Sequence, residues 1–518
     1  MTPNANLERL HDAGVSIWLD TLSRQLLDSG DFAGLIDDCS VTGATSNPTI
    51  FATAITGSDL YDQQLRRLAS EGNHDTRELF FALALDDVRA AARELRSAYD
   101  HSDGRDGFIS FECTPDLADD TEATIIQATE LWQRLDQPNV LIKVPGTQAG
   151  LPAIEELTRR GINVNVTLLF ALDRYEAVID AYLRGLTARA AAGESLAGMA
   201  SVASFFLSRI DTKVDARLAA DSPLRGRVAI ASARAAYQRY LAKFAGPEWE
   251  RLEALGARSQ RPLWASTGTK NPEYSDVLYV AELVAPDVIS TMPQQTLRAF
   301  ADHGEVARTL DSEPARADQT LADAAATGID LAAITATLER EGVQAFCKSY
   351  HQLLDCIGGK LGALDRRSPT AQRVLVLTNE DLADANEVPE SIRPLLDAAE
   401  EVYVVAPTLT TWMQWLADDR DSALVAADER LRTVFDHMRA GGLEPHGEIG
   451  AENQVTAITD ALARFDADLI VLRLHAPGSE HENWREHRIA KNVRSHFDVA
   501  TVVFYFDSEG LVVERDEA

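Results

Sequence analysis

The sequence predicts an α/β protein in which a (β/α)8 TIM barrel is followed by a smaller α/β domain with an open parallel sheet. Eight short apolar runs alternate with helix-length segments between about residues 14 and 295, and strands that alternate with helices form parallel sheets buried on both faces. Eight such units over about 280 residues match the size of a closed barrel. A doubly wound open sheet is the alternative, but no G-x-G-x-x-G follows the first run.

The predicted strands of the barrel mostly end in Gly, Pro, Ser, Thr, Asn or Asp, as strands that lead into turns do. They are VSIWLD (15–20), CSVTGATSNP (39–48), FISFECTP (108–115), NVLIKVPG (139–146), INVNVTLLF (162–170), GMASVASFFLSRID (198–211), PLWASTG (262–268) and VISTMP (288–293). Intervening segments such as 59–71 and 120–135 are long enough for helices. Residues 296–362 are also expected to be helical, so the barrel domain is predicted to span 1–363.

A second domain is predicted to span 373–518, after a polar, proline-containing linker at 364–372. Strands are expected at RVLVLT (373–378), VYVVAP (402–407), LIVLRL (469–474) and ATVVFYF (500–506), and helices around 389–400, 422–441 and 454–465. Four or five short strands with helices between them in about 145 residues predict a three-layer domain with a small open parallel sheet.

Composition limits the classes of partner. The 518 residues suffice for two to four domains, and 81 acidic against 49 basic residues give a net charge of −32. Such a surface repels phosphate backbones and anionic lipids, so neither nucleic-acid nor membrane binding is expected. The four cysteines show no metal-ligand spacing and are expected to be reduced thiols. Without a signal peptide or a long apolar run, the protein is predicted to be cytoplasmic.

Most of the basic residues are arginines, and only seven of the 49 are lysines. Lys143 nevertheless lies inside the apolar run at 139–146. Arginine cannot lose its proton to become an amine nucleophile, whereas burial favours the neutral, nucleophilic form of a lysine amine. A lysine in this place therefore suggests a chemical role.

Polar side chains stand at the carboxyl ends of the predicted strands, where barrels place their catalytic groups. They are Asp20, Thr45, Asn47, Glu112, Lys143, Asn165, Thr167, Ser204, Arg209, Ser266 and Lys270. A lysine amine, two carboxylates that move protons, hydroxyl and amide donors for a polyol, and cations for a phosphate are what an imine-forming aldolase needs.

Each of these residues also has a simpler interpretation. Lys143 could reach solvent or pair with Glu112, and Asp20 could cap a helix. The alternating pattern of Asn165 and Thr167 fits either a polar barrel interior or a hydrogen-bonded turn, and Arg209 could form a surface ion pair with nearby acids. The Gly-containing STGTK lacks the full spacing of a nucleotide loop. These residues alone indicate a barrel that handles sugars or phosphates.

Taken together, the segments closely resemble the transaldolase family, particularly its longer bacterial form. The resemblance covers about residues 7 to 362 and keeps the family's motif order. The motifs are SIWLD (16–20), TSNPTIF (45–51), FECTPDLADDTEAT (111–124), NVLIKVPGT (139–147), GINVNVTLLF (161–170), SVASFFLSRIDTKVD (201–215), WASTGTKNPEYSD (264–276) and STMPQQTL (290–297).

The resemblance implies a role for each residue. Lys143 would form the Schiff base with a ketose phosphate, Asp20 would take the C4 hydroxyl proton, and Glu112 would shuttle protons through a water with Thr167. Asn47 and Asn165 would hold the dihydroxyacetone fragment, with Thr45 and Ser204 nearby, and Arg209, Ser266 and Lys270 would bind the phosphate. Phe206 is also expected among the substrate-binding residues. The match of Lys270 is the loosest, because many relatives place an arginine there with different spacing.

The resemblance further implies transfer of dihydroxyacetone between sugar phosphates in the non-oxidative pentose phosphate pathway, without metal or organic cofactor. Related fructose 6-phosphate aldolases carry glutamine at the position of Glu112 and an acid/base tyrosine near that of Phe206, so transfer is favoured here over simple aldol cleavage. Such an aldolase, and a non-catalytic stress-response or scaffold protein, remain the alternatives.

The second domain resembles universal-stress-protein or flavodoxin-like domains. The stretch 475–493 has a single glycine, Gly478, instead of their glycine-rich nucleotide loop, which makes nucleotide binding doubtful. The acidic stretch 408–431 suggests either a partner surface or a helix packed on its own sheet. A regulatory, docking or oligomerisation role is expected, with a homo-oligomer or a protein partner held through this domain.

Overall fold

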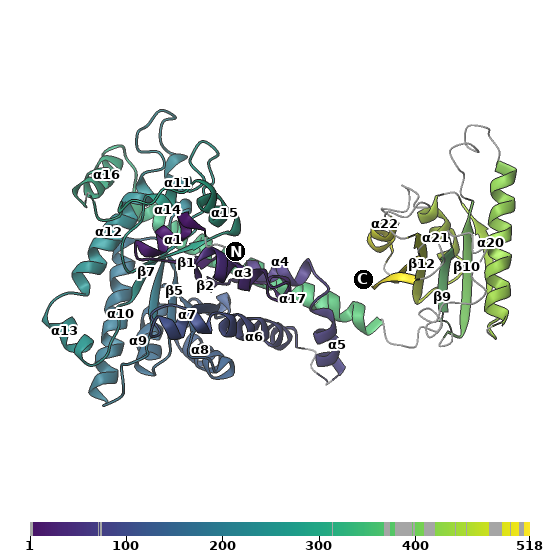
Figure 1. The fold of residues 1–518 in the computed structure, drawn as a ribbon, viewed down its shortest axis with the longest axis horizontal. Helices are drawn as coiled ribbons and strands as arrows, with labels where there is room; N and C mark the ends of the chain where they lie inside the picture. The colour runs from purple at the N-terminus through teal and green to yellow at the C-terminus, as the bar shows by residue number, and fades with distance from the viewer. Residues whose placement is uncertain are drawn as a thin grey trace. The chain divides into compact units, whose positions relative to one another are not determined.

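The computed structural model describes residues 4–517 except 71, 73–74, 313, 367–372, 379–395, 397–398, 409–419, 441, 452, 476–488, 498 and 507–511. The chain separates into two compact units, Met1–Gly358 and Gly359–Ala518 (Figure 1). Each unit is described by itself below.

The first unit is built on a closed barrel of eight parallel strands in chain order, as predicted. The strands are β1 (Val15–Leu19), β2 (Val41–Thr45), β3 (Phe108–Glu112), β4 (Val140–Pro145), β5 (Val164–Leu169), β6 (Ser201–Phe206), β7 (Arg261–Ala265) and β8 (Val288–Met292). The barrel closes where β8 pairs with β1, from Val15 opposite Val288 to Leu19 opposite Met292. Each of the eight predicted apolar runs therefore coincides with a barrel strand, with β7 beginning one residue before its run.

Helices surround the barrel (Figure 1). They are α1 (Ala5–Asp12), α2 (Arg24–Asp28), α3 (Asp31–Cys39), α4 (Pro48–Thr56), α5 (Asp62–Ser70), α6 (Thr76–Glu94), α7 (Arg96–His101), α8 (Thr121–Leu135), α9 (Gly150–Arg159), α10 (Leu172–Ala191), α11 (Ser208–Asp215), α12 (Val228–Lys243), α13 (Pro247–Ala254), α14 (Leu278–Ala281), α15 (Gln294–His303), α16 (Pro314–Ala326) and α17 (Leu331–Arg366), with a 3-10 turn at Pro115–Leu117.

Close packing inside the barrel explains one glycine of β2. The Trp18 side chain of β1 is fully buried, and its Nε1 donates a hydrogen bond of 2.8 Å to Asp106 Oδ1. A Cβ atom on Gly43 would lie only 2.4 Å from Trp18 Nε1, so this position of β2 admits no side chain. The indole therefore takes the space that a side chain at position 43 would need.

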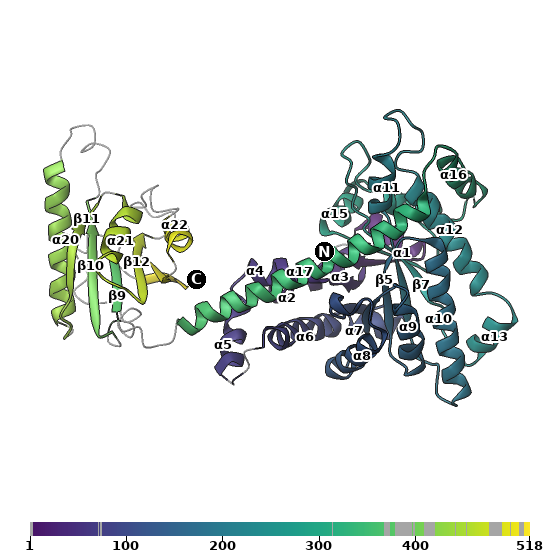
Figure 2. The same ribbon diagram turned by 180° about the vertical axis from the view of Figure 1, so that it is seen from behind.

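The long helix α17 begins in the first unit, continues past Gly358 and runs to Arg366, into the segment predicted as the linker (Figure 2). It contacts the barrel helices and loops through Lys213–Glu341 (2.7 Å), Thr49–Ser349 (2.9 Å) and His351–Asp116 (3.1 Å). The rest of the predicted linker, 367–372, lies outside the described residues. The domain limits 363 and 373 stay predictions.

The second unit contains a six-stranded sheet in the order β11-β10-β9-β12-β13-β14. Its strands are β9 (Arg373–Thr378), β10 (Glu401–Pro407), β11 (His446–Gly450), β12 (Leu469–His475), β13 (Ala500–Phe506) and β14 (Val512–Glu517). The parallel part of the sheet was expected. The edge strand β14 is antiparallel to β13, and neither it nor β11 was among the predicted strands.

Helices cover both faces of this sheet (Figures 1 and 2). Ala427, Leu431 and Val434 of α20 (Arg420–Ala440) pack on one face, and α21 (Gln454–Leu462) and α22 (Ile489–His496) pack on the other. The expected helix at 389–400 lies almost wholly outside the described residues, as do 409–419 of the acidic stretch and 476–488 of the stretch 475–493.

Among the described residues, no single helix is both long and apolar enough to cross a bilayer. Two helical segments joined at a bend, 315–326 and 331–361, resemble a membrane span in their combined length and composition only.

Candidate active site

A cleft of about 220 Å³ opens at the carboxyl ends of the barrel strands and gathers most of the predicted site residues. Its lining consists of Asp20, Thr45, Asn47, Thr49, Ile50, Lys143, Thr167, Ser204, Phe206, Arg209, Leu263, Ala265, Ser266, Thr291 and Phe346. Glu112 and Asn165 lie directly beside it, because they pair in register with Lys143 on the neighbouring strands.

Lys143 sits in the middle of this arrangement. It is 5% exposed on β4, between the fully buried Ile142 and Val144. Its Nζ atom donates a hydrogen bond of 3.1 Å to the carbonyl oxygen of Ser46 and lies 3.7 Å from Glu112 Oε2. Lys143 is therefore not a solvent-reaching strand-end lysine: the amine is held inside the barrel, against one carboxylate and at the wall of the cleft.

The Glu112 carboxyl is prepared for proton transfer. Burial raises the pKa of Glu112 to about 7, an effect that the nearby Lys143 opposes and that the negative charge of Asp20 reinforces. Near neutral pH this side chain therefore exists in both its acid and its base form.

Two polar atoms at this place can bind a further polar group. Glu112 Oε2 and Thr167 Oγ1 are buried and have no hydrogen-bond partner within the described part of the chain. Buried polar atoms are normally paired, so both are suited to hold a water or a reacting hydroxyl. Next to Thr167, the pairing of β5 with β6 shifts register and Leu168 adopts φ +60°, which marks a strand irregularity of the kind found at active sites.

Asp20 is positioned by hydrogen bonds at both its backbone and its side chain. Its amide donates to the Met292 carbonyl at 2.8 Å, and its Oδ1 accepts from Thr45 Oγ1 at 2.7 Å. The helix-cap interpretation of Asp20 is wrong, because the N-cap of α2 is Ser23, whose side chain accepts from the Leu26 amide. The Asp20 carboxylate thus remains at the cleft.

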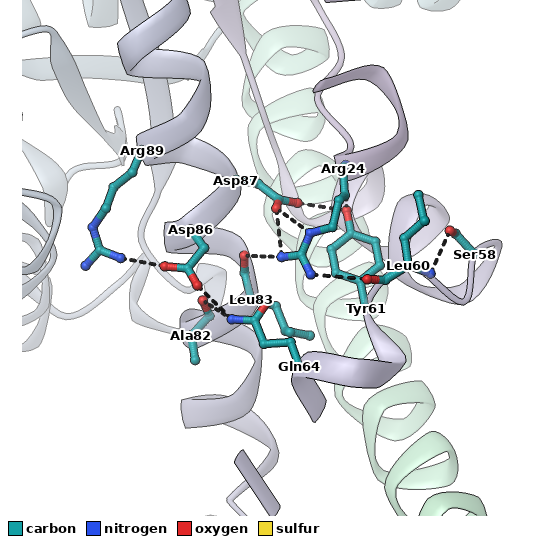
Figure 3. A network of polar contacts seen from close by, with 10 residues as sticks. All are labelled: Arg24, Ser58, Leu60, Tyr61, Gln64, Ala82, Leu83, Asp86, Asp87 and Arg89. Atoms are coloured by element: carbon teal, nitrogen blue, oxygen red, sulfur yellow. Dashed lines mark hydrogen bonds and ion pairs between the residues drawn. The ribbon is translucent and has the colours of Figure 1, made fainter. Parts of the chain in front are cut away.

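The segment that follows Asp20 is anchored by a buried network between α2, α6 and the start of α5 (Figure 3). Arg24 donates to Asp87 Oδ1 through Nε (3.0 Å) and Nη2 (2.8 Å), and its guanidinium stacks over the Tyr61 ring at 4.3 Å. The Tyr61 hydroxyl donates to Asp87 Oδ2 at 2.8 Å and accepts from the Arg24 amide. This network fixes the loop between β1 and α2 from outside the barrel.

The amide side chains are held in one orientation each. Asn165 donates from Nδ2 to Ser110 Oγ at 2.9 Å, and its Oδ1 accepts from Ser204 Oγ at 2.7 Å. Asn165 and Thr167 face the interior of the barrel, so the turn interpretation of this pair is wrong. Asn47 caps α4, because its Oδ1 accepts from the Ile50 amide at 3.0 Å, which leaves its Nδ2 for a ligand.

A cationic end completes the cleft. Arg209 on α11 stacks its guanidinium over the Phe206 ring at 5.4 Å, and burial lowers its pKa from the usual value. The acids next to it in sequence are engaged elsewhere, Asp211 by Tyr279 and Asp215 by Tyr274, and no ion pair of Arg209 is found in the described ranges. The surface-ion-pair interpretation of Arg209 is therefore wrong.

Ser266 lies beside this arginine at the end of β7. Its Oγ is 2.9 Å from Ser208 Oγ, and its backbone adopts the left-handed φ of +57°, uncommon for a residue other than glycine. Lys270, predicted at the same place, is exposed and does not line the cleft. The structure thus brings together all the predicted site residues except Lys270.

Six further lining residues were not predicted: Thr49, Ile50, Leu263, Ala265, Thr291 and Phe346. Thr291 is the last residue but one of β8, in the run 288–293, and the strand-end rule could have found it. Phe346 comes from α17, far along the chain, and nothing in the local sequence marks it. Among the described residues, no three His, Cys, Asp or Glu side chains are grouped as metal ligands.

A closed (β/α)8 barrel that holds a buried lysine, two carboxylates and an arginine at its carboxyl end defines a barrel enzyme with a lysine-centred active site. Residues 17–357 match the model of one family, described as transaldolase/fructose-6-phosphate aldolase. The chain belongs to this family.

Curated relatives narrow the assignment within the family. The chain is 49% identical to a transaldolase of Mycolicibacterium smegmatis over 369 residues, which are 70% of this chain and 99% of the relative. It is also 49% identical to a transaldolase of Frankia alni, over 69% of this chain and 97% of the relative. A transaldolase of Acidothermus cellulolyticus is 50% identical, over 67% and 94%. These matches show an enzyme of the transaldolase type.

Proposed function

We propose that this enzyme transfers a dihydroxyacetone unit from a ketose phosphate, sedoheptulose 7-phosphate or fructose 6-phosphate, to an aldose phosphate, glyceraldehyde 3-phosphate or erythrose 4-phosphate. This is the transaldolase reaction of the non-oxidative pentose phosphate pathway. The observation that carries the proposal is the buried Lys143 amine, 3.7 Å from Glu112 Oε2, in one cleft with Asp20 and Arg209.

The first half of the reaction forms an imine. The Lys143 amine attacks the C2 carbonyl of the ketose phosphate, and Glu112 in its acid form gives a proton to the departing hydroxyl, so that water leaves. A pKa of about 7 suits Glu112 to this step and, as a base, to activating water in the reverse hydrolysis. Thr167 and a bridging water relay the proton between Glu112 and the carbinolamine.

The second half breaks and remakes a carbon–carbon bond. Asp20 takes the C4 hydroxyl proton, the C3–C4 electron pair moves towards the iminium, and the first aldose leaves while an enamine stays on Lys143. The enamine attacks the carbonyl carbon of the second aldose, and Asp20 returns the proton to the new hydroxyl. Hydrolysis of the imine then releases the new ketose and regenerates the amine.

The remaining residues hold the substrate. Asn47, Asn165, Thr45 and Ser204 are suited to the hydroxyls of the three-carbon fragment, and Phe206 forms a wall beneath Arg209. Arg209 and Ser266 bind the phosphate. Phe206 carries no hydroxyl and Glu112 is a carboxylate, which supports transfer over simple aldol cleavage.

Borohydride trapping tests the lysine assignment. Fructose 6-phosphate and borohydride are expected to leave one covalent adduct per chain on the wild type and none on Lys143→Ala. Lys213→Ala is the matched control, since Lys213 is a partly exposed lysine paired with Glu341. An adduct that survives Lys143→Ala contradicts the assignment.

For the second unit, the proposal is a regulatory, docking or oligomerisation role, through which the enzyme binds a second copy of itself or another protein. The enzyme as a whole is proposed to be cytoplasmic and to act on small sugar phosphates. Its separation as a compact unit supports this proposal. Light scattering of the full chain and of residues 1–366 tests the oligomerisation role, which predicts a larger assembly for the full chain; equal states exclude it.

A further inference from the structure

A row of buried threonines connects the segment after β7, the strands β8 and β2, and Asp20 around the rim of the barrel. Thr267 Oγ1 donates to the carbonyl oxygen of Thr291 at 2.8 Å, and Thr291 Oγ1 lies 2.9 Å from Thr45 Oγ1. Thr45 Oγ1 in turn donates to Asp20 Oδ1 at 2.7 Å. The backbone next to Thr291 is tied to the same aspartate, because the Met292 carbonyl accepts from the Asp20 amide.

The direction of the hydrogen bonds between these threonines and Asp20 follows from the number of protons that each group can donate. An ionised carboxylate only accepts hydrogen bonds, and a hydroxyl carries a single proton. When Thr45 gives its proton to Asp20, the hydrogen bond between Thr45 and Thr291 can only be donated by Thr291. The two hydroxyls therefore point the same way, towards the carboxylate, and a donor that itself accepts a hydrogen bond is the stronger donor.

Burial makes this arrangement stiff. Thr45, Thr267 and Thr291 are each at most 2% exposed, and β-branched side chains keep few rotamers. Asp20 Oδ1 is thereby occupied, while Oδ2 makes no hydrogen bond with any residue that the structure describes. Oδ2 is therefore available to a hydroxyl in the cleft.

We propose that Thr291 is a positioning residue for the carbon–carbon bond step: through Thr45 it holds the Asp20 carboxylate with Oδ2 presented to the C4 hydroxyl. This inference rests on the proposed function. Thr291 lines the cleft, but its hydroxyl is committed to Thr45, so its effect is passed on rather than exerted on the substrate.

The step affected by Thr291 distinguishes this role from a structural one. Imine formation depends on Lys143 and Glu112, whereas C3–C4 cleavage depends on Asp20. Thr291→Val keeps the shape and removes the donor. We expect kcat for transfer to fall about tenfold, the loss of roughly one hydrogen bond, with KM and the rate of borohydride-trapped adduct formation within about twofold of the wild type.

Thr291→Ser is the matched control, because it keeps the hydroxyl and removes only a methyl group. It is expected to restore kcat to within about twofold of the wild type. If Thr291→Val and Thr291→Ser lower kcat equally, or if adduct formation falls in parallel with transfer, Thr291 fills space only and the proposal is wrong.

A double-mutant cycle tests the route through Thr45. In the Thr45→Val background, Thr291→Val is expected to cause no further loss of kcat, since the Thr45 hydroxyl that links Thr291 to Asp20 is already gone. Independent, multiplying losses would show that Thr291 acts on the substrate directly and would overturn the proposal. Failure of the proposed function is seen separately, as absence of transfer by the wild type.

Discussion

At the scale of single residues, the buried Glu112 carboxyl has an altered acidity at the centre of the cleft. Its ordinary pKa of 4.5 is raised to about 7 because burial penalises the charged form more than Lys143 compensates. The folded protein therefore holds this proton more tightly than the unfolded chain between these two pH values. Stability from this group is present at low pH and is lost as the pH rises through about 7.

Replacing Glu112 by glutamine removes this titration. From pH 5 to pH 8 the wild type is expected to lose up to about 3 kcal/mol of unfolding free energy relative to Glu112→Gln, since each pKa unit corresponds to about 1.4 kcal/mol. Urea unfolding of both proteins at the two pH values measures the difference. Parallel pH profiles would show that the Glu112 pKa is not raised.

The identity of the site residues was largely predictable at this scale, because the carboxyl ends of barrel strands converge. Lys143, Asp20, Glu112 and Arg209 were found that way. Lys270 shows the limit of the rule, since a residue several positions beyond its strand can turn to solvent. Phe346 shows another, because the position of a late helix over the cleft depends on tertiary packing.

At the scale of elements, one side chain serves both a helix and the cleft. Asn47 caps α4 through Oδ1 and lines the cleft. Aspartate is an equally good cap and its charge favours a helix N-terminus, but it has no Nδ2 donor for a substrate hydroxyl.

Two substitutions separate these roles of Asn47. Asn47→Asp is expected to keep the melting temperature and to lower kcat/KM at least tenfold. Asn47→Ala loses the cap as well and is expected to cost about 1 kcal/mol of stability. Full activity in a stable Asn47→Asp protein would remove Asn47 from the substrate-binding set.

The network in Figure 3 offers a second test at this scale, in which Asp87 is replaced and the neighbouring Asp86 serves as the control. Asp87 is 3% exposed and bonded to both Arg24 and Tyr61, whereas Asp86 is half exposed and pairs with Arg89 at the surface. Asp87→Ala leaves a largely buried guanidinium without its carboxylate and is expected to cost about 3 kcal/mol. Asp86→Ala is expected to change stability by less than about 1 kcal/mol in the same urea titration, and equal losses would contradict this account.

The elements themselves were predictable where burial makes them apolar, as in all eight strands of the barrel. β11 was missed because its sequence, HGEIG, forms an edge strand with two glycines and two polar residues. β14 was missed because VVERDE ends in charged residues, which suit an edge strand but give no apolar run.

At the scale of the whole molecule, the division into two units bears on where catalysis resides. The family model ends at residue 357, and the relative from Mycolicibacterium smegmatis is matched over 99% of its length by 70% of this chain. All lining residues of the cleft, up to Phe346, belong to the first unit.

Residues 1–366, with α17 complete, are therefore expected to keep kcat and KM within about twofold of the full chain. The measurement is a transfer assay on both proteins at the same concentration of active sites. That concentration is determined by counting borohydride-trapped adducts. Loss of turnover in a folded 1–366 fragment would mean that the second unit supports the barrel.

The central claim, transfer through an enamine on Lys143, is tested most directly by the need for an acceptor. The full chain is incubated with fructose 6-phosphate, with and without erythrose 4-phosphate, and glyceraldehyde 3-phosphate is followed in a coupled assay. Release that depends on erythrose 4-phosphate is the predicted result. Equal release without the acceptor would identify an aldolase, in which the enamine is protonated by water, and would contradict the transfer proposed here.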